Sequence, residues 1–318
     1  MRAMIVGAGL GARLQPLTAL RPKPALPVGG VPLVAYTLAW LHAHGVREVA
    51  INVHHLPEVL EATARRHCPP GMELRFSREQ TLLDTGGGIA RVASFLRESD
   101  PCVLVSGDML MDADLSALVA LHRERGDALT MLLREEPRMR DFGSIGVDAA
   151  GRVRRIATRL DLGGEARAGL YTWVNVVSPR AFDSMPERDR FNHLDDWIAP
   201  LLVAGARDIC GELDLPCRWE PVGTLHEYLR ANLTPPELSY LAHLHPPHAP
   251  RAAREGEVVV GAGAHLAPEA SLKRAVVWDG ERVPDDVQAS DGVFAGGRFH
   301  SIGSNQQPRE DPREDGAK

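Results

Sequence analysis

The chain has 318 residues, of which 44% are hydrophobic, so it exceeds one average domain and can bury a sizeable core. Its net charge of −6, with charges of both signs mixed, provides no polybasic surface for nucleic acid or an anionic membrane. No apolar run approaches the ~20 residues of a membrane span, the first one is too short for a signal peptide, and the cysteines form no C-x-x-C pair. We therefore expect a cytoplasmic protein with free thiols and a small-molecule partner.

The first predicted element is a buried strand followed by a glycine-rich loop. Residues 4–6 are apolar, and Gly7, Gly9 and Gly11 then allow a tight turn whose backbone N–H groups can approach a phosphate chain. No Asp or Glu precedes Glu48, whereas several basic residues do, so the local field favours a polyphosphate. The loop therefore predicts an anion-binding cradle.

Two other interpretations of this loop compete with the cradle. The spacing Gly7-x-Gly9-x-x-Ala12 also fits the dinucleotide-binding fingerprint, which needs a helix at the loop and an acidic residue about 20 positions on. Prolines at 16, 22, 24 and 27 break such a helix, and no carboxylate stands at the required place. A purely structural glycine turn stays open, although the basic residues in the loop favour binding.

Lysine is rare in this chain. Only three of its 36 basic residues are lysines, namely Lys23, Lys273 and Lys318. A compact ammonium at position 23 differs from a guanidinium in reach and hydration, which suits contact with phosphate. Codon bias with chance retention is the alternative explanation.

The stretch from Gly7 to Pro24 resembles the signature of the sugar-1-phosphate nucleotidyltransferases. It reads Gly-Ala-Gly-Leu-Gly-Ala-Arg-Leu-x-Pro-Leu-Thr-x-x-x-Pro-Lys-Pro, which is long and mixed in chemistry. The resemblance implies an α/β fold of the Rossmann-like (GT-A-like) type, with a mixed sheet and helices on both faces. It also implies a Mg²⁺-dependent reaction, in which a sugar 1-phosphate attacks the α-phosphorus of a nucleoside triphosphate and releases pyrophosphate.

The same resemblance assigns roles to residues of the loop. Arg13 would hold the departing pyrophosphate, and Lys23 would neutralise the α-phosphate and the sugar phosphate, so both are catalytic candidates. The nucleotide would be held by the loop residues Ala8, Gly9, Leu10 and Gly11.

The following residues alternate between helical and strand patterns, which predicts parallel βαβ units. Helices are expected at 32–44, 57–67, 89–96 and 115–124, and strands at 48–53, 72–77 and 102–106. From residue 128 the pattern predicts strands at 128–134, 144–148 and 152–156, then helices at 179–184 and 194–204. His54, His55 and His193 lack metal-binding spacing, so we interpret them as structural.

The glycine-rich stretch from Glu79 to Ile89 is the candidate base-binding segment. Its sequence, Leu-Asp-Thr-Gly-Gly-Gly-Ile, is most similar to the muramate, heptose and mannose-1-phosphate branch of the family. The backbone of Gly86 and Gly87 could approach a nucleobase closely, and an ionised Glu79 could accept its N–H groups. A solvated surface position for Glu79 is an equal alternative.

Metal and sugar candidates follow further along the chain. Asp108 comes after the apolar run 103–105, at a strand's carboxyl end where open α/β sheets bind ligands, and in the family this Asp binds Mg²⁺. The pair Phe142-Gly143 resembles an aromatic-Gly pair that meets the sugar. The sugar-binding candidates are Gly143, Trp173 and Asn175.

The sequence departs from the family pattern at the metal and on the sugar side. The segment 219–232 matches the family's closing segment, but Pro221 stands where a second metal-binding Asp is usual. Glu220 is the remaining metal candidate there, although in a strand it would face away from residue 221. Trp173 replaces a usual glycine, and no Glu-Lys-Pro follows Ile156.

We expect a nucleotidyltransferase domain at 1–233, a Pro-rich linker at 234–254, a third segment at 255–303 and a disordered tail at 304–318. In the third segment Val260, Leu266, Leu272 and Trp278 recur every six residues, which predicts a short C-terminal left-handed β-helix-like hexapeptide segment. So few repeats need partners to cover their ends, which suggests a homo-oligomer or docking on the main domain.

The expected activity is nucleotidyl transfer from a nucleoside triphosphate to a sugar 1-phosphate. The rival from another class is a regulatory subunit that binds a nucleotide sugar without making it, and the absence of the second metal carboxylate would suit such a protein. A dinucleotide-dependent enzyme is a third and weaker reading.

Overall fold

The computed structural model describes residues 1–137, 143–246, 253–255 and 257–302, which form two compact units. The first unit holds residues 1–27, 31–223 and 236–246, and the second holds 28–30, 224–235 and the described residues from 253 onward. The predicted boundary at residue 233 differs from this grouping, because the helix after Thr224 belongs to the second unit. Phe142 and the predicted tail 304–318 lie outside the described residues.

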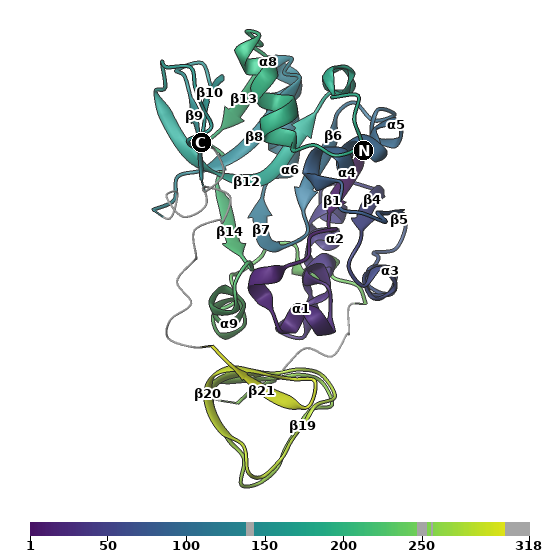
Figure 1. Ribbon diagram of the computed structural model, residues 1–318, viewed down its shortest axis with the longest axis vertical. Helices are drawn as coiled ribbons and strands as arrows, with labels where there is room; N and C mark the ends of the chain where they lie inside the picture. The colour runs from purple at the N-terminus through teal and green to yellow at the C-terminus, as the bar shows by residue number, and fades with distance from the viewer. Residues whose placement is uncertain (138–142, 247–252, 256, 303–318) are drawn as a thin grey trace, which may run out of the picture. The chain divides into compact units, whose positions relative to one another are not determined.

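The first unit is built on a mixed sheet (Figure 1). Within the described residues its strands are β1 (Arg2–Val6), β4 (Glu48–Val53), β5 (Glu73–Arg78), β6 (Cys102–Ser106), β8 (Leu129–Arg134), β9 (Ser144–Val147), β10 (Val153–Ile156), β11 (Leu160–Asp161), β12 (Arg167–Val177) and β13 (Ile209–Glu212). Eight of them follow the order β11-β10-β9-β12-β6-β1-β4-β5, while β8 pairs with β12 and β13. The short pair β7 (Met109–Ala113) and β14 (Cys217–Pro221) forms a separate antiparallel ribbon.

The centre of the main sheet is parallel. β1 pairs in parallel with β4 and β6, whereas β12 pairs with β6 in the antiparallel direction. Ala3, Met4 and Ile5 are consecutive in β1 and all fully buried, which requires cover on both faces of the sheet. The predicted mixed α/β sheet is therefore confirmed.

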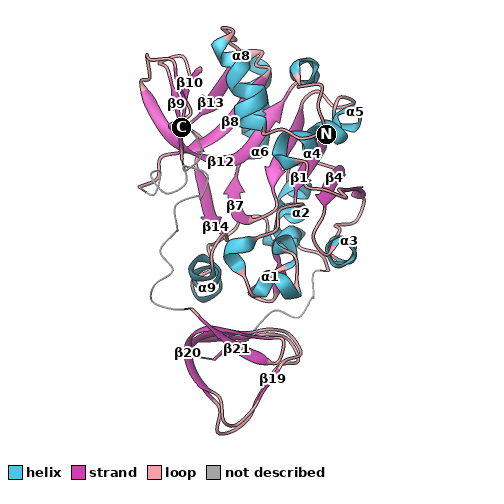
Figure 2. Cartoon of the chain, viewed as in Figure 1, coloured by secondary structure: helices cyan, strands magenta, loops and turns pink. Residues whose placement is uncertain are grey.

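Helices surround the strands of the first unit (Figure 2). They are α1 (Leu17–Leu20), α2 (Leu33–Ala43), α3 (Pro57–Arg66), α4 (Asp84–Arg91), α5 (Ala93–Leu96), α6 (Leu115–Arg125) and α8 (Ala199–Val203), with 3-10 turns at Ala12–Leu14, Lys23–Ala25, Pro179–Ser184 and Leu241–His243 and a π-helical turn at His193–Ile198. None of the helices in the described parts of the chain is both long and apolar enough to cross a membrane.

The glycine triplet corrects one expectation from the sequence. Glycine disfavours helix, so the pattern predicts a loop before residue 89, yet Gly86, Gly87 and Gly88 lie inside α4 and are buried. A β-carbon at Gly86 or Gly87 would overlap the 189–191 segment, and one at Gly88 would crowd Asn52 and Glu79. Close packing around the helix thus requires glycine and outweighs its low helix propensity.

The second unit combines one helix with stacked strands. α9 (Leu225–Leu233) begins at Thr224, whose side chain accepts a hydrogen bond from the N–H of Glu227 in a capping box. The strands are β15 (Ala253–Glu255), β16 (Val258–Val260), β17 (His265–Leu266), β18 (Ser271–Val277), β19 (Arg282–Val283), β20 (Gln288–Ala295) and β21 (Arg298–Ser301). Two further short strands, β2 (Pro27–Val28) and β3 (Val31–Pro32), lie in the N-terminal part of the chain.

The stacked strands repeat every 17 residues. Val260 of β16 pairs with Val277 of β18, which in turn pairs with Phe294 of β20, all three in parallel strands. A strict six-residue repeat would complete a coil after 18 residues and would stack Trp278 on Val260. Because the coil has 17 residues, Val277 takes that position instead. Trp278 instead donates its indole N–H to the hydroxyl of Tyr228 on α9 at 2.9 Å.

Candidate active site

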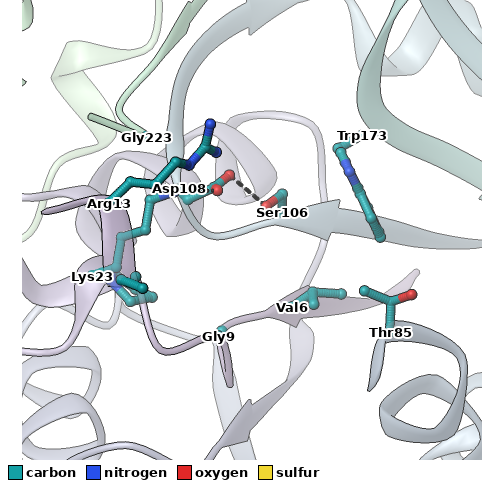
Figure 3. Close-up of a pocket in the computed structure, with 13 residues that line it drawn as sticks. Val6, Gly9, Arg13, Lys23, Thr85, Ser106, Asp108, Trp173 and Gly223 are labelled. Atoms are coloured by element: carbon teal, nitrogen blue, oxygen red, sulfur yellow. Dashed lines mark hydrogen bonds and ion pairs between the residues drawn. The ribbon is translucent and has the colours of Figure 1, made fainter. Parts of the chain in front are cut away.

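A cavity of about 340 Å³ opens at the carboxyl ends of β1 and β6. Gly7 follows the first of these adjacent parallel strands and Gly107 the second, so both loops reach the same edge of the sheet. The lining residues are Val6, Gly7, Gly9, Gly11, Ala12, Arg13, Lys23, Pro24, Thr85, Ser106, Asp108, Trp173 and Gly223. The predicted loop and the predicted Asp therefore share one cavity (Figure 3).

Hydrogen bonds fix both ends of the glycine loop, while its middle is open. The N–H of Gly7 donates to Asn52 Oδ1 at 2.8 Å, and Gly11, with φ +62°, has its carbonyl bonded by the Thr18 hydroxyl at 3.0 Å. In the described structure no hydrogen bond occupies the backbone N–H groups of residues 8–11, and a β-carbon at Gly9 would meet nothing within 4 Å. The loop thus offers several unpaired donors, which is the geometry of an anion cradle.

A lysine and a carboxylate meet at the centre of the cavity. Lys23 Nζ lies 2.6 Å from Asp108 Oδ2, and the Ser106 hydroxyl donates to Oδ1 at 2.5 Å. Burial alone would raise the pKa of Asp108, but the Lys23 charge, the hydrogen bonds from Lys23 and Ser106, and the Arg13 charge together lower the pKa below its usual value. Asp108 is therefore held in its charged form.

Arg13 lies in the short turn after the glycine loop, on the same side of the cavity as Lys23 (Figure 3). A main-chain hydrogen bond joins two segments at the cavity, since the carbonyl of Asp108 accepts the N–H of Val222 at 3.1 Å. That bond brings Gly223 to the cavity.

Trp173 forms the opposite wall (Figure 3). It interrupts β12 at a bulge between Tyr171 and Asn175, and its φ of +63° is left-handed, a conformation that favours glycine. Its ring centroid lies 4.2 Å from that of His193. The bulge explains physically why a glycine at this position suits the family pattern that the sequence resembles.

The backbone strain at Trp173 can be measured with two truncations. Both Trp173→Gly and Trp173→Ala remove the indole, but only glycine relieves the left-handed conformation. We expect Trp173→Gly to be more stable than Trp173→Ala by about 1 kcal/mol in urea unfolding. Equal stabilities would show that the bulge relaxes once the ring is gone.

The other sugar-side candidates do not line the cavity. Asn175 is 2% exposed, and its Oδ1 accepts the Tyr171 hydroxyl at 2.9 Å, while its Nδ2 has no partner within the described chain. Gly143 has a φ of +79°, and a β-carbon there would lie 3.6 Å from Ala157 Cβ. Their contact with a sugar stays a prediction.

The base-binding candidates have internal partners. Glu79 is only 5% exposed, which excludes the surface alternative, and its carboxylate accepts hydrogen bonds from Asn52 Nδ2 at 2.7 Å and from the Leu83 N–H at 3.1 Å. The N–H groups of Gly86 and Gly87 both donate to the Phe191 carbonyl, at 2.9 and 3.2 Å. A role for these three residues in base binding stays a prediction.

The second metal candidate, Glu220, does not line the cavity that holds Asp108. In β14, Trp219 and Pro221 are buried while Glu220 between them is half-buried, and Glu220 is not among the lining residues of the cavity. Pro221 pairs with Met109, directly after Asp108. Across the described ranges, no three His, Cys, Asp or Glu side chains are grouped to hold a metal ion.

Sequence reasoning missed Thr85 as a lining residue. Its hydroxyl lies 2.8 Å from His193 Nδ1, and the Tyr171 hydroxyl lies 3.2 Å from His193 Nε2. Burial lowers the pKa of His193 to about 3, with a smaller contribution from the Arg159 charge, so the ring is neutral. The position of Thr85 directly before the glycine triplet was the feature of the sequence that could have indicated it as a lining residue.

Comparison with known proteins places the chain in a family. Residues 2–236 match the family model described as nucleotidyl transferase. The chain is 31% identical over 295 residues to a mannose-1-phosphate guanylyltransferase of Mycobacterium tuberculosis, covering 88% of this chain and 80% of the relative. It is 28% identical over 247 residues to a UTP–glucose-1-phosphate uridylyltransferase of Synechocystis, covering 73% and 62%.

A solved structure supports the fold. HddC from Yersinia pseudotuberculosis, complexed with GMP-PN, matches with a TM-score of 0.59 and 18% identity, covering 72% of this chain and 97% of that one. The family match and the relatives agree, so the chain belongs to the nucleotidyl transferase family, among the sugar-1-phosphate nucleotidyltransferases that its loop signature resembles.

Proposed function

We propose that this protein transfers a nucleotidyl group from a nucleoside triphosphate to a sugar 1-phosphate, with release of pyrophosphate. The observation that carries the proposal is the cavity at residues 7–13, where unpaired backbone donors, Arg13, Lys23 and Asp108 converge. Phosphoryl transfer asks a protein mainly for alignment and charge neutralisation, which these groups supply. The rival regulatory reading is not favoured, because the relatives named above are transferases.

In the proposed mechanism Lys23 exchanges partners. Its ammonium neutralises Asp108 in the free protein and moves to the α-phosphate and the sugar phosphate when substrates bind. Arg13 and the loop amides hold the β- and γ-phosphates and then the departing pyrophosphate. The sugar phosphate oxygen attacks the α-phosphorus directly, so no side chain is needed as a nucleophile.

The residues present fit a Mg²⁺ ion held chiefly by the nucleotide. Asp108 offers the only carboxylate among the described lining residues, and Lys23 and Ser106 already bind its oxygens. Mg²⁺ is commonly held by one or two carboxylates, substrate phosphates and waters. When bound, it would neutralise phosphate charge, with Asp108 as its protein ligand.

Pyrophosphate release from a panel of triphosphates and sugar 1-phosphates tests the proposal. The panel includes GTP with mannose 1-phosphate and UTP with glucose 1-phosphate, because the relatives named above differ in both base and sugar. We expect release from at least one pair that depends on Mg²⁺. No release from any pair, with tight binding of a nucleotide sugar, would instead support the regulatory reading.

Pro221→Asp tests the single-carboxylate site. We expect weak Mg²⁺ binding to the free wild-type protein, stronger binding in the nucleotide complex, and a lower Mg²⁺ requirement in Pro221→Asp, because the new carboxylate stands next to the Asp108 segment. Calorimetric titration with MgCl₂ measures all three. Tight binding to the free protein that the substitution leaves unchanged would mean that another carboxylate, such as Glu220, already completes the site.

Three further expectations remain predictions. We propose that the 17-residue coils form a short left-handed β-helix, as the hexad pattern predicts. Assembly through this unit and a cytoplasmic location are also proposed from the sequence.

A further inference from the structure

The two walls of the cavity differ in charge. Arg13, Lys23 and Asp108 gather on one side, while Trp173 and Thr85 on the other side are uncharged (Figure 3). Arg159, the first charged residue after Ile156, is engaged with Asp195 at 2.9 and 3.1 Å. Within the described lining residues, the Trp173 wall therefore offers no partner for a charged substituent.

The in-line geometry of the reaction indicates that the sugar 1-phosphate, which is the acceptor, binds beside Trp173. Attacking and leaving oxygens lie roughly in line with the transferred phosphorus. If Arg13 and the glycine loop hold the pyrophosphate and Lys23 the α-phosphate, the attacking sugar phosphate approaches from the side away from Arg13. That side ends at Trp173 (Figure 3).

Behind Trp173 lies a layer of neutral polar groups. Thr85, His193, Tyr171 and Asn175 are linked by hydrogen bonds of 2.8, 3.2 and 2.9 Å. The Trp173 ring packs on both His193 and Tyr171, with centroids 4.2 and 5.5 Å away. Asn175 and the layer's aromatic rings do not line the cavity, so the indole separates them from it.

We propose that Trp173 determines acceptor specificity: its indole separates His193, Tyr171 and Asn175 from the cavity and selects a neutral sugar 1-phosphate that packs an apolar C–H face against the ring. This inference rests on the proposed function and names the substrate class of the same site. Aromatic faces pack well against apolar surfaces and need no charge on the ligand. In the described structure the Trp173 indole N–H has no hydrogen-bond partner, so it can also donate to one sugar hydroxyl.

Binding measurements on the nucleotide-loaded protein test the inference before any turnover. The protein is saturated with a non-hydrolysable triphosphate and Mg²⁺, then titrated by calorimetry with glucose 1-phosphate, mannose 1-phosphate, glucosamine 1-phosphate and glucuronic acid 1-phosphate. We expect the neutral sugars to bind at least about 10-fold more tightly than the charged ones. Trp173→Phe keeps a ring at the same backbone conformation and should stay within about threefold of wild type.

Trp173→Ala keeps a β-carbon but removes the ring. It should weaken neutral sugar binding roughly 10-fold and leave triphosphate affinity within about twofold. Circular dichroism checks that both variants fold. Unchanged sugar affinity in Trp173→Ala, or an equal loss of triphosphate affinity, would overturn the inference.

Failure of the proposed function gives a different pattern. If sugar 1-phosphates bind with the expected preference but no pyrophosphate is released, the assignment of Trp173 stands and catalysis is refuted. If pyrophosphate is released but wild type favours a charged sugar, catalysis stands and the Trp173 assignment is overturned. Absence of any sugar 1-phosphate binding to the loaded protein would overturn both.

Discussion

Replacing Lys23 by alanine is expected to lower kcat by at least about 100-fold, with the fold intact. The ammonium lies 2.6 Å from Asp108 Oδ2, its side chain is only 12% exposed, and Lys23 lines the cavity. Removing it takes away the charge that would neutralise the α-phosphate and leaves Asp108 without its cation. Steady-state pyrophosphate release with the best substrate pair measures the effect.

Lys23→Arg is the matched control, because it keeps the charge but replaces a compact ammonium with a planar fork. We expect it to recover only part of the lost turnover. The Lys23→Ala protein should also bind Mg²⁺ to Asp108 more readily in the absence of nucleotide, since the competing cation is gone. Turnover close to wild type in Lys23→Ala would remove Lys23 from the mechanism.

Gly87→Ala is expected to destabilise the first unit by about 2–3 kcal/mol. Gly87 is buried in α4, and a β-carbon there would overlap the carbonyl oxygen of Asp189. Backbone cannot rotate away as a flexible side chain can, so either the helix or the 189–191 segment must shift. Urea unfolding, monitored by circular dichroism, gives the change in the free energy of unfolding.

Gly9→Ala provides the stability control, because a β-carbon at Gly9 would meet nothing within 4 Å. It should change the free energy of unfolding by less than about 0.5 kcal/mol. A Gly87→Ala protein as stable as wild type that has lost triphosphate affinity would contradict the packing role. That result would restore the nucleobase contact predicted from the sequence.

Features that depend on a local pattern or a long motif could be predicted from the sequence alone. The strands at Glu48–Val53 and Cys102–Ser106 have the predicted bounds. The phosphate loop and Asp108 were brought into one site by the family resemblance, since they are distant in the chain. These features depend on side-chain period or on a long motif, both of which are visible in one sequence.

Features set by tertiary contact could not be predicted in the same way. The glycine helix α4 exists because the 189–191 segment packs against it, and that segment follows about 100 residues later. The bulge that places Trp173 in a left-handed conformation depends on pairing with β8 and β9. The ion pair of Lys23 with Asp108 also joins residues far apart in the sequence.

The order of the C-terminal strands limits how copies of this chain can associate. β16, β18 and β20 run parallel, but β15 and β21 at the two margins of that sheet run antiparallel to their neighbours. An open parallel edge would let another molecule continue the 17-residue register and extend end to end, as fibres do. Because the chain reverses direction at both margins of this sheet, another molecule cannot continue the parallel register there. Any association through this sheet would therefore need a different geometry from the one that stacks its own coils.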